Sequence, residues 1–487
     1  MIILFHPKST RPRNRRFPLS ILALAAVLEG HDEYEIVDGN VDPNPLQTIV
    51  GLMERHSIEL LAVSVMPGPQ MVAAMETCRE IRIRFAGVPI VWGGYFPSIY
   101  TKAALNAPYV DFAVRGQGEE TFLELVEALR GKRSFASIPG LSFIDTSGRH
   151  QHNCDRPLKR PDAFPVFPYY RLEAERYIVP TFLGQRTAVH QTSIGCPYRC
   201  NFCGVVTVYD SREKMESPAR TEATLRHLAT TYGVNALQFY DNNFFLREDH
   251  VQELAERLTP LQMRWWSEGR VDIVLSYSDK TLSALKQSGS TMIFFGAESG
   301  SDWVLKEMNK GLRAEQTLEL ARRLRRFGII PEFSFVIGNP NDPERDTSEC
   351  LEFIRTIKRL NPDAEIIVQH YVPVPQRQSM YGKIEDKVQF PETVEEWATD
   401  RWLNFTLRKE PAAPWLKSST KQRIDNFELV VASRWPTVQD FRLSMWGRGL
   451  LRALSAWRYR LGIYSYPVEL EWAQRLIALR KPKVESI

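Results

Sequence analysis

Short apolar runs alternate with charged, amphipathic stretches along most of this 487-residue chain, and this alternation limits its fold more than any other feature. In the first third, the apolar runs have the length of strands and are separated by helix-like stretches such as residues 19–29 and 71–85. The runs lie at residues 2–6, 34–38, 60–65, 89–93 and 112–115. Such alternation is typical of an open, parallel α/β sheet, whose ligands bind beyond the carboxyl ends of the strands.

The alternation resumes after residue 186. The strand-like runs lie at residues 190–194, 236–240, 263–267, 291–295, 333–337 and 365–371. Consecutive parallel βα units of this kind close, or partly close, into a barrel whose active face is formed by the carboxyl ends of the strands. We therefore expect a second α/β domain with its site at the barrel mouth.

Three cysteines follow the first of these runs. Cys196, Cys200 and Cys203 form a Cys-x-x-x-Cys-x-x-Cys loop, which supplies three thiolates and no fourth. Four protein ligands complete an ordinary iron–sulfur cluster or a structural zinc site, so three leave one metal corner open for chemistry. The alternative interpretation is a zinc knuckle that His190 completes.

The cysteine loop resembles that of the radical S-adenosylmethionine (SAM) enzymes, and Phe202 stands where that family favours an aromatic residue. The resemblance implies a [4Fe-4S] cluster on the three thiolates, with SAM bound to the unique iron and cleaved to a 5′-deoxyadenosyl radical. It also implies a partial six-unit barrel. The protein supplies orientation and protection from side reactions.

The same resemblance implies SAM contacts in the cysteine loop and at the following strand ends. A carboxylate beside a guanidinium, as in Glu268 and Arg270, suits the two charged ends of methionine. Asn242 stands where the family usually has a second Asp. For single polar residues, helix capping or salt bridging is an equal alternative, and Ser299, Ser301 and Asp302 read as N-caps. The expected contacts are Tyr198, Phe202, Asp241, Asn243, Glu268, Arg270, Glu298, Ser299 and Gly338.

Glycine-rich turns follow the strands of the first third, and each alone reads as a plain strand-to-helix turn. Together with the cysteine loop, they resemble the cobalamin-binding domain of a radical SAM class that includes anaerobic magnesium-protoporphyrin ester cyclase, hopanoid methylases and phosphinate methylases. The implied cobalamin contacts are Ser64, Met66, Gly93, Gly94, Tyr95, Gly116, Gly118 and Glu119.

The Asp-x-His-x-x-Gly pattern that donates an axial histidine to cobalt is absent from the sequence. His6 is the nearest candidate, and a lone histidine at a strand end more often has a structural role. We therefore expect cobalamin without a histidine ligand, with loss of the cofactor as the alternative. The basic loop at residues 11–16 reads as solvated, or as a contact for an anionic group.

Composition narrows the class of protein. A formal charge of +4 on so long a chain gives no case for nucleic acid as a partner, and 44% hydrophobic content permits a full core. The six cysteines do not form a disulfide-like pattern, which indicates a reducing compartment. No apolar run reaches about 18 residues, and the start of the chain lacks a signal-peptide pattern, so we expect a cytoplasmic protein.

The expected fold class is α/β, with four regions. Residues 1–135 form a Rossmann-like cobalamin-binding domain, 136–185 a proline-rich linker with a hairpin at 141–153, 186–385 the partial (β/α)6 barrel, and 386–487 a mostly helical region that covers the substrate. In that last region Trp446, Leu450, Leu451, Leu454 and Trp457 recur at helical spacing. Packing against the barrel is the default for such a stripe; a substrate pocket and peripheral contact with a membrane are alternatives.

These observations favour a cobalamin-dependent radical SAM methyltransferase that acts on an unactivated carbon of a hydrophobic or natural-product substrate. A radical SAM oxidative cyclase or hydroxylase of the tetrapyrrole type is the alternative within the class. A non-catalytic cobalamin or zinc carrier is the alternative outside it. An electron donor such as flavodoxin or ferredoxin is an expected partner, and the sequence singles out no general base.

Overall fold

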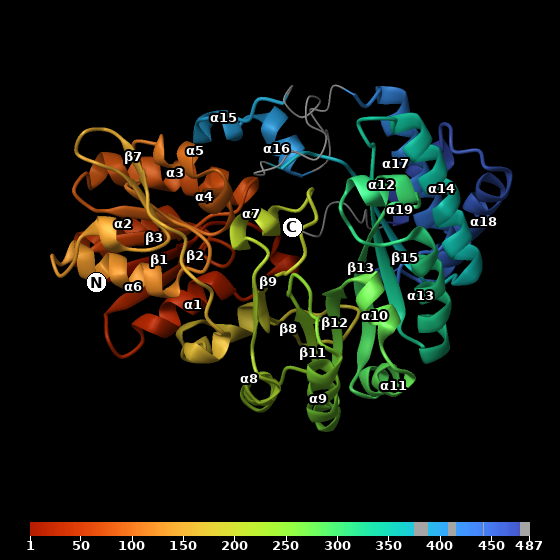
Figure 1. The fold of residues 1–487 in the computed structure, drawn as a ribbon, viewed down its shortest axis with the longest axis horizontal. Helices are drawn as coiled ribbons and strands as arrows, with labels where there is room; N and C mark the ends of the chain where they lie inside the picture. Colours follow the sequence, from red (N-terminus) through yellow and green to blue (C-terminus); the bar gives the residue numbers. More distant parts are fainter. Residues whose placement is uncertain (375–387, 408–414, 442, 478–487) are drawn as a thin grey trace.

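The computed structural model describes residues 1–374, 388–407, 415–441 and 443–477 (Figure 1). The first domain is built on a sheet in the order β2-β1-β3-β4-β5-β6-β7, in which β1 to β5 are parallel. Its parallel strands are β1 (Ile2–His6), β2 (Tyr34–Asp38), β3 (Leu60–Ser64), β4 (Ile90–Gly93) and β5 (Phe112–Val114). These match the predicted runs to within one residue at each end, because all but the edge strand β2 are apolar enough to be buried on both faces.

Helices cover both faces of this sheet (Figure 1). On one face, α1 and α6 bury residues such as Ile21 and Leu125; on the other, α2 and α3 bury residues such as Ile49 and Ile81. The helices are α1 (Leu19–Leu28), α2 (Pro45–Arg55), α3 (Pro69–Arg84), α4 (Tyr95–Ile99), α5 (Thr101–Leu105) and α6 (Glu119–Leu129). The domain is therefore a three-layer α/β sandwich.

The hairpin expected within the linker belongs to this sheet instead. Strands β6 (Leu141–Ile144) and β7 (His150–His152) pair antiparallel, and β6 pairs with β5. The physical reason is aromatic packing: the Phe112 and Phe143 rings both contact Phe135, at centroid distances of 4.9 and 6.0 Å. The sheet thus extends beyond residue 135.

The second domain contains a six-stranded parallel sheet in the order β15-β14-β13-β12-β11-β8, which confirms the expected partial barrel. Its strands are β8 (Thr187–His190), β11 (Ala236–Phe239), β12 (Arg264–Gly269), β13 (Ser290–Glu298), β14 (Ile330–Ile337) and β15 (Glu365–His370). Helices lie on the outside: α8 (Pro218–Tyr232), α9 (Glu248–Leu258), α10 (Val271–Ser276), α11 (Asp279–Gln287), α12 (Asp302–Glu307), α13 (Ala314–Phe327) and α14 (Pro343–Leu360).

The first barrel strand ends earlier than expected. β8 stops at His190, and residues 193–195 form β9 (Ser193–Gly195), which pairs antiparallel with β10 (Glu213–Met215) in a separate ribbon. Gly195 is essential to this ribbon, because it has φ +82° and a Cβ there would lie 2.1 Å from the Arg212 carbonyl oxygen. The cysteine loop therefore leaves the ribbon, and not the barrel strand itself.

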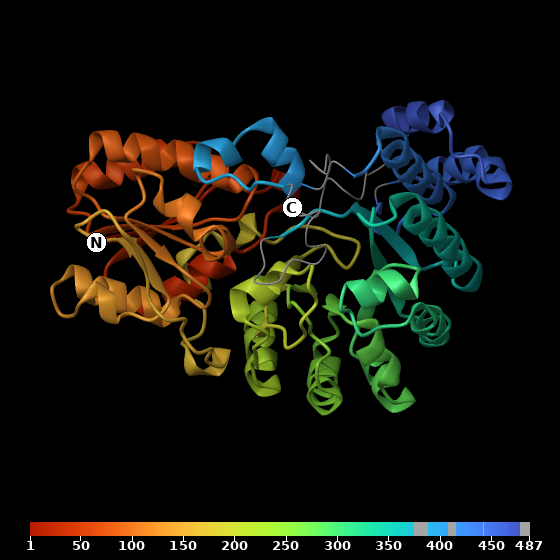
Figure 2. The same ribbon diagram turned by 45° about the horizontal axis from the view of Figure 1, so that its top comes forward.

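The C-terminal region divides between the two domains (Figure 2). Helices α15 (Val394–Trp397) and α16 (Asp400–Thr406) pack on the first domain, where Trp397 and Trp402 join the core beneath α3. Three further helices pack on the barrel side: α17 (Ser418–Arg434), α18 (Met445–Leu461) and α19 (Val468–Ile477). Helix α17 lies against β15 and α14, and α18 lies between α17 and α19. None of the helices in the described ranges is long and apolar enough to cross a membrane.

The prediction that the apolar stripe of α18 packs against the barrel is mostly wrong. Leu451 is buried and Leu454 partly buried, but Trp446 is 90% exposed, Leu450 49% and Trp457 46%. The helix packs through a different face, centred on Leu451, Ser455 and Arg458. Periodicity identified the helix correctly but not the side that meets the protein.

Candidate active site

The three cysteines lie in the loop between β9 and helix α7 (Gly204–Tyr209). Burial raises the pKa of the Cys203 thiol to about 11 and raises that of Cys196 as well. Arg270 and Lys310 oppose this effect for Cys196, because positive charge favours a thiolate. Cys200 is buried, and Cys196 and Cys203 are partly exposed. Three soft thiol ligands beside two cations fit an iron–sulfur cluster that leaves one iron open.

Arg270 joins the cysteine loop to the barrel. Its guanidinium lies 3.6 Å from the centroid of the Tyr198 ring, its Nη1 lies 3.5 Å from the Cys200 sulfur, and its Nη2 donates to the Lys310 carbonyl oxygen at 2.6 Å. It also pairs with Asp272, with Nε and Oδ1 3.1 Å apart. Arg270 was expected from the sequence, and the structure places it and Tyr198 together at the loop.

Lys310 was missed by the sequence analysis. Its Nζ donates to Glu298 Oε1 at 2.7 Å, and both side chains are less than a tenth exposed. Glu298 sits at a register shift in β13 with φ +63°, a conformation that costs a non-glycine residue strain. Lys310 follows a short helix and looks like an ordinary surface lysine in the sequence, so only tertiary structure reveals the pair.

The end of β11 carries buried polar atoms without protein partners. Asp241 Oδ1 accepts hydrogen bonds from the Thr192 backbone, the Thr192 hydroxyl and the Ser193 hydroxyl, at 2.6–2.9 Å. Among the described residues, Asp241 Oδ2 and both amide atoms of Asn243 have no hydrogen-bond partner, although each side chain is 1% exposed. Orphaned buried polar groups are costly, so these atoms fit contacts with a polar ligand such as the methionine end of SAM.

Several of the other expected SAM contacts have protein partners. The Ser299 hydroxyl lies 3.5 Å from Asp346 Oδ1, and Asp346 Oδ2 accepts from the Gly338 backbone at 2.8 Å. The Trp415 indole donates to the Gly338 carbonyl oxygen at 3.2 Å. Ser301 is the N-cap residue of α12, as its sequence suggested, but its hydroxyl donates to Glu349 and not to the helix. Phe202 packs with Val304 and Met308 in a small cluster.

Six of the eight expected cobalamin contacts, all except Met66 and Tyr95, border a cavity of about 240 Å³ at the carboxyl ends of β3, β4 and β5. Gly94 has φ +97°, and a Cβ there would lie 3.1 Å from the Val65 carbonyl oxygen. Ser64 shares a hydrogen bond of 2.8 Å with Ser20, and burial raises the pKa of Glu119. Met66 is 48% exposed. Ser64, Gly93, Gly94, Gly116, Gly118 and Glu119 line the cavity.

This glycine-lined face contacts the cysteine loop. Helix α7 packs against α4, and a Cβ at Gly204 would lie 1.7 Å from the Tyr95 hydroxyl. A Cβ at Gly116 would lie 3.6 Å from the Val208 carbonyl oxygen. The two expected cofactor sites are therefore adjacent, on facing surfaces of the two domains.

His6 has a structural role, as the sequence favoured. Its Nδ1 lies 3.2 Å from Asp38 Oδ1 and 3.1 Å from Asn40 Nδ2, and its Nε2 lies 3.0 Å from Gln70 Nε2. His190 is likewise engaged, with Nε2 2.9 Å from Glu216 Oε2 in a buried contact. From the basic loop, Arg16 Nε donates to the Tyr240 hydroxyl at 3.1 Å, so that loop reaches the barrel.

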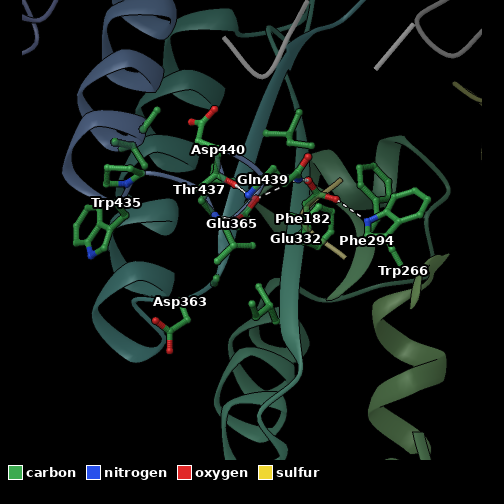
Figure 3. A pocket seen from close by; sticks show the side chains of 18 of the residues that line it. Phe182, Trp266, Phe294, Glu332, Asp363, Glu365, Trp435, Thr437, Gln439 and Asp440 are labelled. Atoms are coloured by element: carbon green, nitrogen blue, oxygen red, sulfur yellow. Dashed lines mark hydrogen bonds between the residues drawn. The ribbon is translucent and has the colours of Figure 1, made fainter. Parts of the chain in front are cut away.

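A cavity of about 660 Å³ occupies the barrel interior and its side (Figure 3). Glu332 accepts from the Trp266 indole at 3.0 Å and from Gln439, whose Nε2 also lies 3.1 Å from Glu365 Oε2. Burial, with the charges of Asp241 and Glu332, raises the pKa of Glu268 to about 8. The sequence analysis did not anticipate the cluster of Glu332, Glu365 and Gln439. Gln439, which joins the two carboxylates, comes from the distant segment between α17 and α18.

A glycine-lined α/β domain, joined to a partial barrel with a three-thiolate loop at its mouth, defines a two-domain cobalamin and radical SAM architecture. Residues 12–126 match the B12 binding domain, and residues 191–354 match the Radical SAM superfamily. The chain is thus a radical SAM enzyme with an N-terminal B12-binding domain, and the expectation of cobalamin, SAM and a [4Fe-4S] cluster is confirmed.

Relatives and solved structures agree with this assignment. The chain is 26% identical to an uncharacterized methyltransferase of Pyrococcus horikoshii, over 70% of this chain and 73% of the relative. It is 26% identical to an anaerobic magnesium-protoporphyrin IX monomethyl ester cyclase of Synechocystis, over 77% and 75% of the two chains. The fold resembles TsrM, a radical SAM methyltransferase of Kitasatospora setae solved with cobalamin and a [4Fe-4S] cluster, with TM-score 0.67, 16% identity and 98% of each chain covered.

Proposed function

We propose that this enzyme is a cobalamin-dependent methyltransferase that methylates an unactivated carbon of a hydrophobic or natural-product substrate. The observation that carries the proposal is the contact of α7 with α4, which sets the cysteine loop against the glycine-lined face. A methyl carrier and a radical source must act on the same substrate carbon, so their sites must adjoin one space. The methyltransferase names among the relatives support the same conclusion.

The chemistry of the bound groups is that of the class: SAM and the cluster supply a 5′-deoxyadenosyl radical, and cobalamin supplies the methyl group. In this proposal Cys196, Cys200 and Cys203 hold the cluster, and Asp241 and Asn243 accept and donate to the methionine end of SAM. Arg270 and Lys310 provide positive charge beside the thiolates. The proposed SAM site also includes Tyr198, Phe202, Glu268, Glu298, Ser299 and Gly338.

In the first domain, the protein contributes mainly the shape of the proposed cobalamin site. Gly93, Gly94, Gly116 and Gly118 line the cavity without side chains, which favours a large flat ligand. Tyr95 packs against Gly204 at the start of α7. Ser64, Met66, Gly93, Gly118 and Glu119 are the other proposed contacts. We retain the division into residues 1–135, 136–185, 186–385 and 386–487 as a functional proposal, with β6 and β7 joined to the first sheet.

The barrel cavity is the proposed substrate site. Its volume of about 660 Å³ lies within the range of small-molecule pockets, and Phe182, Trp266 and Phe294 form an aromatic wall (Figure 3). An aromatic wall favours an apolar body, while Glu268, Glu332 and Glu365 among the lining residues offer polar contacts.

The test is anaerobic reconstitution of the full chain with iron, sulfide and cobalamin, followed by turnover with methyl-deuterated SAM and a chemical or flavodoxin-type reductant. Candidate lipids, tetrapyrroles and peptides are supplied in turn. The proposal expects about four irons per chain, 5′-deoxyadenosine, S-adenosylhomocysteine, and a product heavier by one deuterated methyl group.

Two other outcomes contradict the proposal. A product that loses hydrogens without gaining label identifies an oxidative cyclase, the activity carried by the name of the Synechocystis relative. A colourless protein with one zinc per chain and no deoxyadenosine identifies a non-catalytic carrier.

A further inference from the structure

Helix α18 carries an apolar stripe on the side that faces solvent. Trp446, Leu450, Trp457 and Leu461 are 90%, 49%, 46% and 65% exposed, and they recur at the spacing of one helical face. The opposite side, with Leu451 and Ser455 both 0% exposed, already packs against the protein. A surface helix normally turns polar residues outward, so this stripe is not explained by the fold.

The neighbouring helix α19 has the same character. Val468, Trp472 and Leu476 are 49%, 61% and 82% exposed and stand four residues apart. The two helices pack on each other through Leu451, Leu454 and Ala473. We call the seven exposed side chains of the two stripes the α18–α19 surface.

Arginine outnumbers acidic residues around the α18–α19 surface: α19 carries Glu469 and Glu471 beside Arg475. Helix α18 contains four arginines and no acidic residue. Arg448 donates to the carbonyl oxygens of Pro436, Thr437 and Asp440, and Arg458 pairs with Glu469. Arg452 and Arg460 are exposed and have no ion-pair partner in the described part of the chain. The surface therefore combines apolar anchors with positive charge available to a ligand.

Arginine also lies against two of the exposed indoles. The Arg458 guanidinium is 4.6 Å from the Trp457 ring centroid, and that of Arg475 is 5.9 Å from the Trp472 ring. Indole rings with neighbouring guanidinium groups are enriched where apolar chains give way to charged headgroups, because both side chains have an apolar body and a polar part.

Charge decides between the possible occupants. A second copy docked about a two-fold axis would bring the same arginines together. The sequence after α19 contains Arg480, Lys481 and Lys483 against Glu485, so it does not complement the surface either. None of the seven apolar side chains lines either of the two cavities described above, so they project as anchors. We propose that the α18–α19 surface docks on a membrane with anionic headgroups.

The location of the surface connects it with the barrel cavity. Arg448 and Arg452, from the same helix, line that cavity. Docking through the solvent side of α18 would hold the helix that borders the cavity at the membrane surface. The inference goes beyond methyl transfer and does not depend on it.

The test is co-sedimentation of the reconstituted full chain with vesicles of phosphatidylcholine, with and without phosphatidylglycerol. Binding is expected only with phosphatidylglycerol and is expected to weaken as salt rises, because screening shortens the reach of surface charge. Arg452→Gln and Arg460→Gln should each weaken binding by about fivefold. Trp446→Gln combined with Trp472→Gln should weaken it by about tenfold or more.

The matched control is Ile83→Gln on α3, where Ile83 is 76% exposed. It should leave vesicle binding unchanged. Unfolding temperatures of all variants check that the replaced exposed residues do not alter the fold. Equal binding to neutral vesicles, no binding at low salt, or binding that survives the tryptophan variants would overturn the proposal. Self-association seen by light scattering and lost in the tryptophan variants would assign the surface to a second copy instead.

Discussion

The two facing surfaces at the centre of this enzyme are built differently. At the barrel mouth, ionic and polar side chains are held by one another, as in Asp241 with Thr192 and Ser193, or Lys310 with Glu298. On the first domain, the corresponding strand ends are glycines whose backbone approaches other backbone closely, as at Gly94. The difference teaches that a small zwitterion needs fixed charges to orient it, whereas a broad flat ligand needs an unobstructed surface.

The largest effect should come from the barrel mouth. Cys200→Ser removes one cluster ligand, so we expect loss of bound iron and reduction of SAM cleavage to background, with cobalamin binding retained. Iron analysis and 5′-deoxyadenosine assays check this. Cys154→Ser, at an exposed free cysteine, is the control and should change neither. Full SAM cleavage by Cys200→Ser would contradict the proposal that Cys200 holds the cluster at the barrel mouth.

The Lys310–Glu298 pair tests whether the charges at the mouth depend on each other. Lys310→Met leaves Glu298 buried without its cation and should lower the free energy of unfolding by about 3–5 kcal/mol. Adding Glu298→Gln should restore much of that loss. Denaturant titration measures both. Lys306→Met, at an exposed lysine on α12, should have little effect; equal losses from Lys306→Met would show that the pair is not special.

Gly94→Ala tests the opposite surface. The new Cβ would meet the Val65 carbonyl at 3.1 Å in a conformation that L residues rarely adopt. The strain should lower the free energy of unfolding by about 1–3 kcal/mol. Displacement of the cavity lining at Gly94 should in addition weaken cobalamin binding by about tenfold or more, without altering SAM cleavage to deoxyadenosine. Cobalamin titration followed by absorbance is the measurement. Gly87→Ala, in open space, is the control; weaker SAM cleavage in Gly94→Ala would contradict the division of roles.

The smallest effect concerns Glu268, whose pKa of about 8 means that folding favours the protonated carboxyl. The folded state then binds a proton that the unfolded state releases above about pH 4.5, so stability should fall as pH rises from about 5 to 8. Relative to Glu268→Gln, we expect a loss on the order of 1–3 kcal/mol over that range. Unfolding at several pH values checks it, with the exposed Glu256→Gln as the control. Parallel pH curves for wild type and Glu268→Gln would show an ionised Glu268.

Much of the site could be predicted because it follows directly from strand ends. The five parallel strands of the first domain and five of the six barrel strands were visible as apolar runs, whereas β8 lies before its predicted run. Asp241, Arg270 and Gly94 follow such runs closely. Lys310 and Gln439 could not be predicted in the same way. Each reaches its partners only when segments far apart in the chain meet, and neither stands in a distinctive pattern.

The sequence by itself determined the alternating α/β architecture and the gathering of three cysteines in one loop, because local polarity and residue spacing do not depend on distant contacts. Tertiary structure alone decided that the C-terminal region divides between two domains, that β6 and β7 extend the first sheet, and which side of α18 faces solvent. These features depend on which surfaces remain to be buried after the domains pack, and that competition cannot be read from helical or strand period.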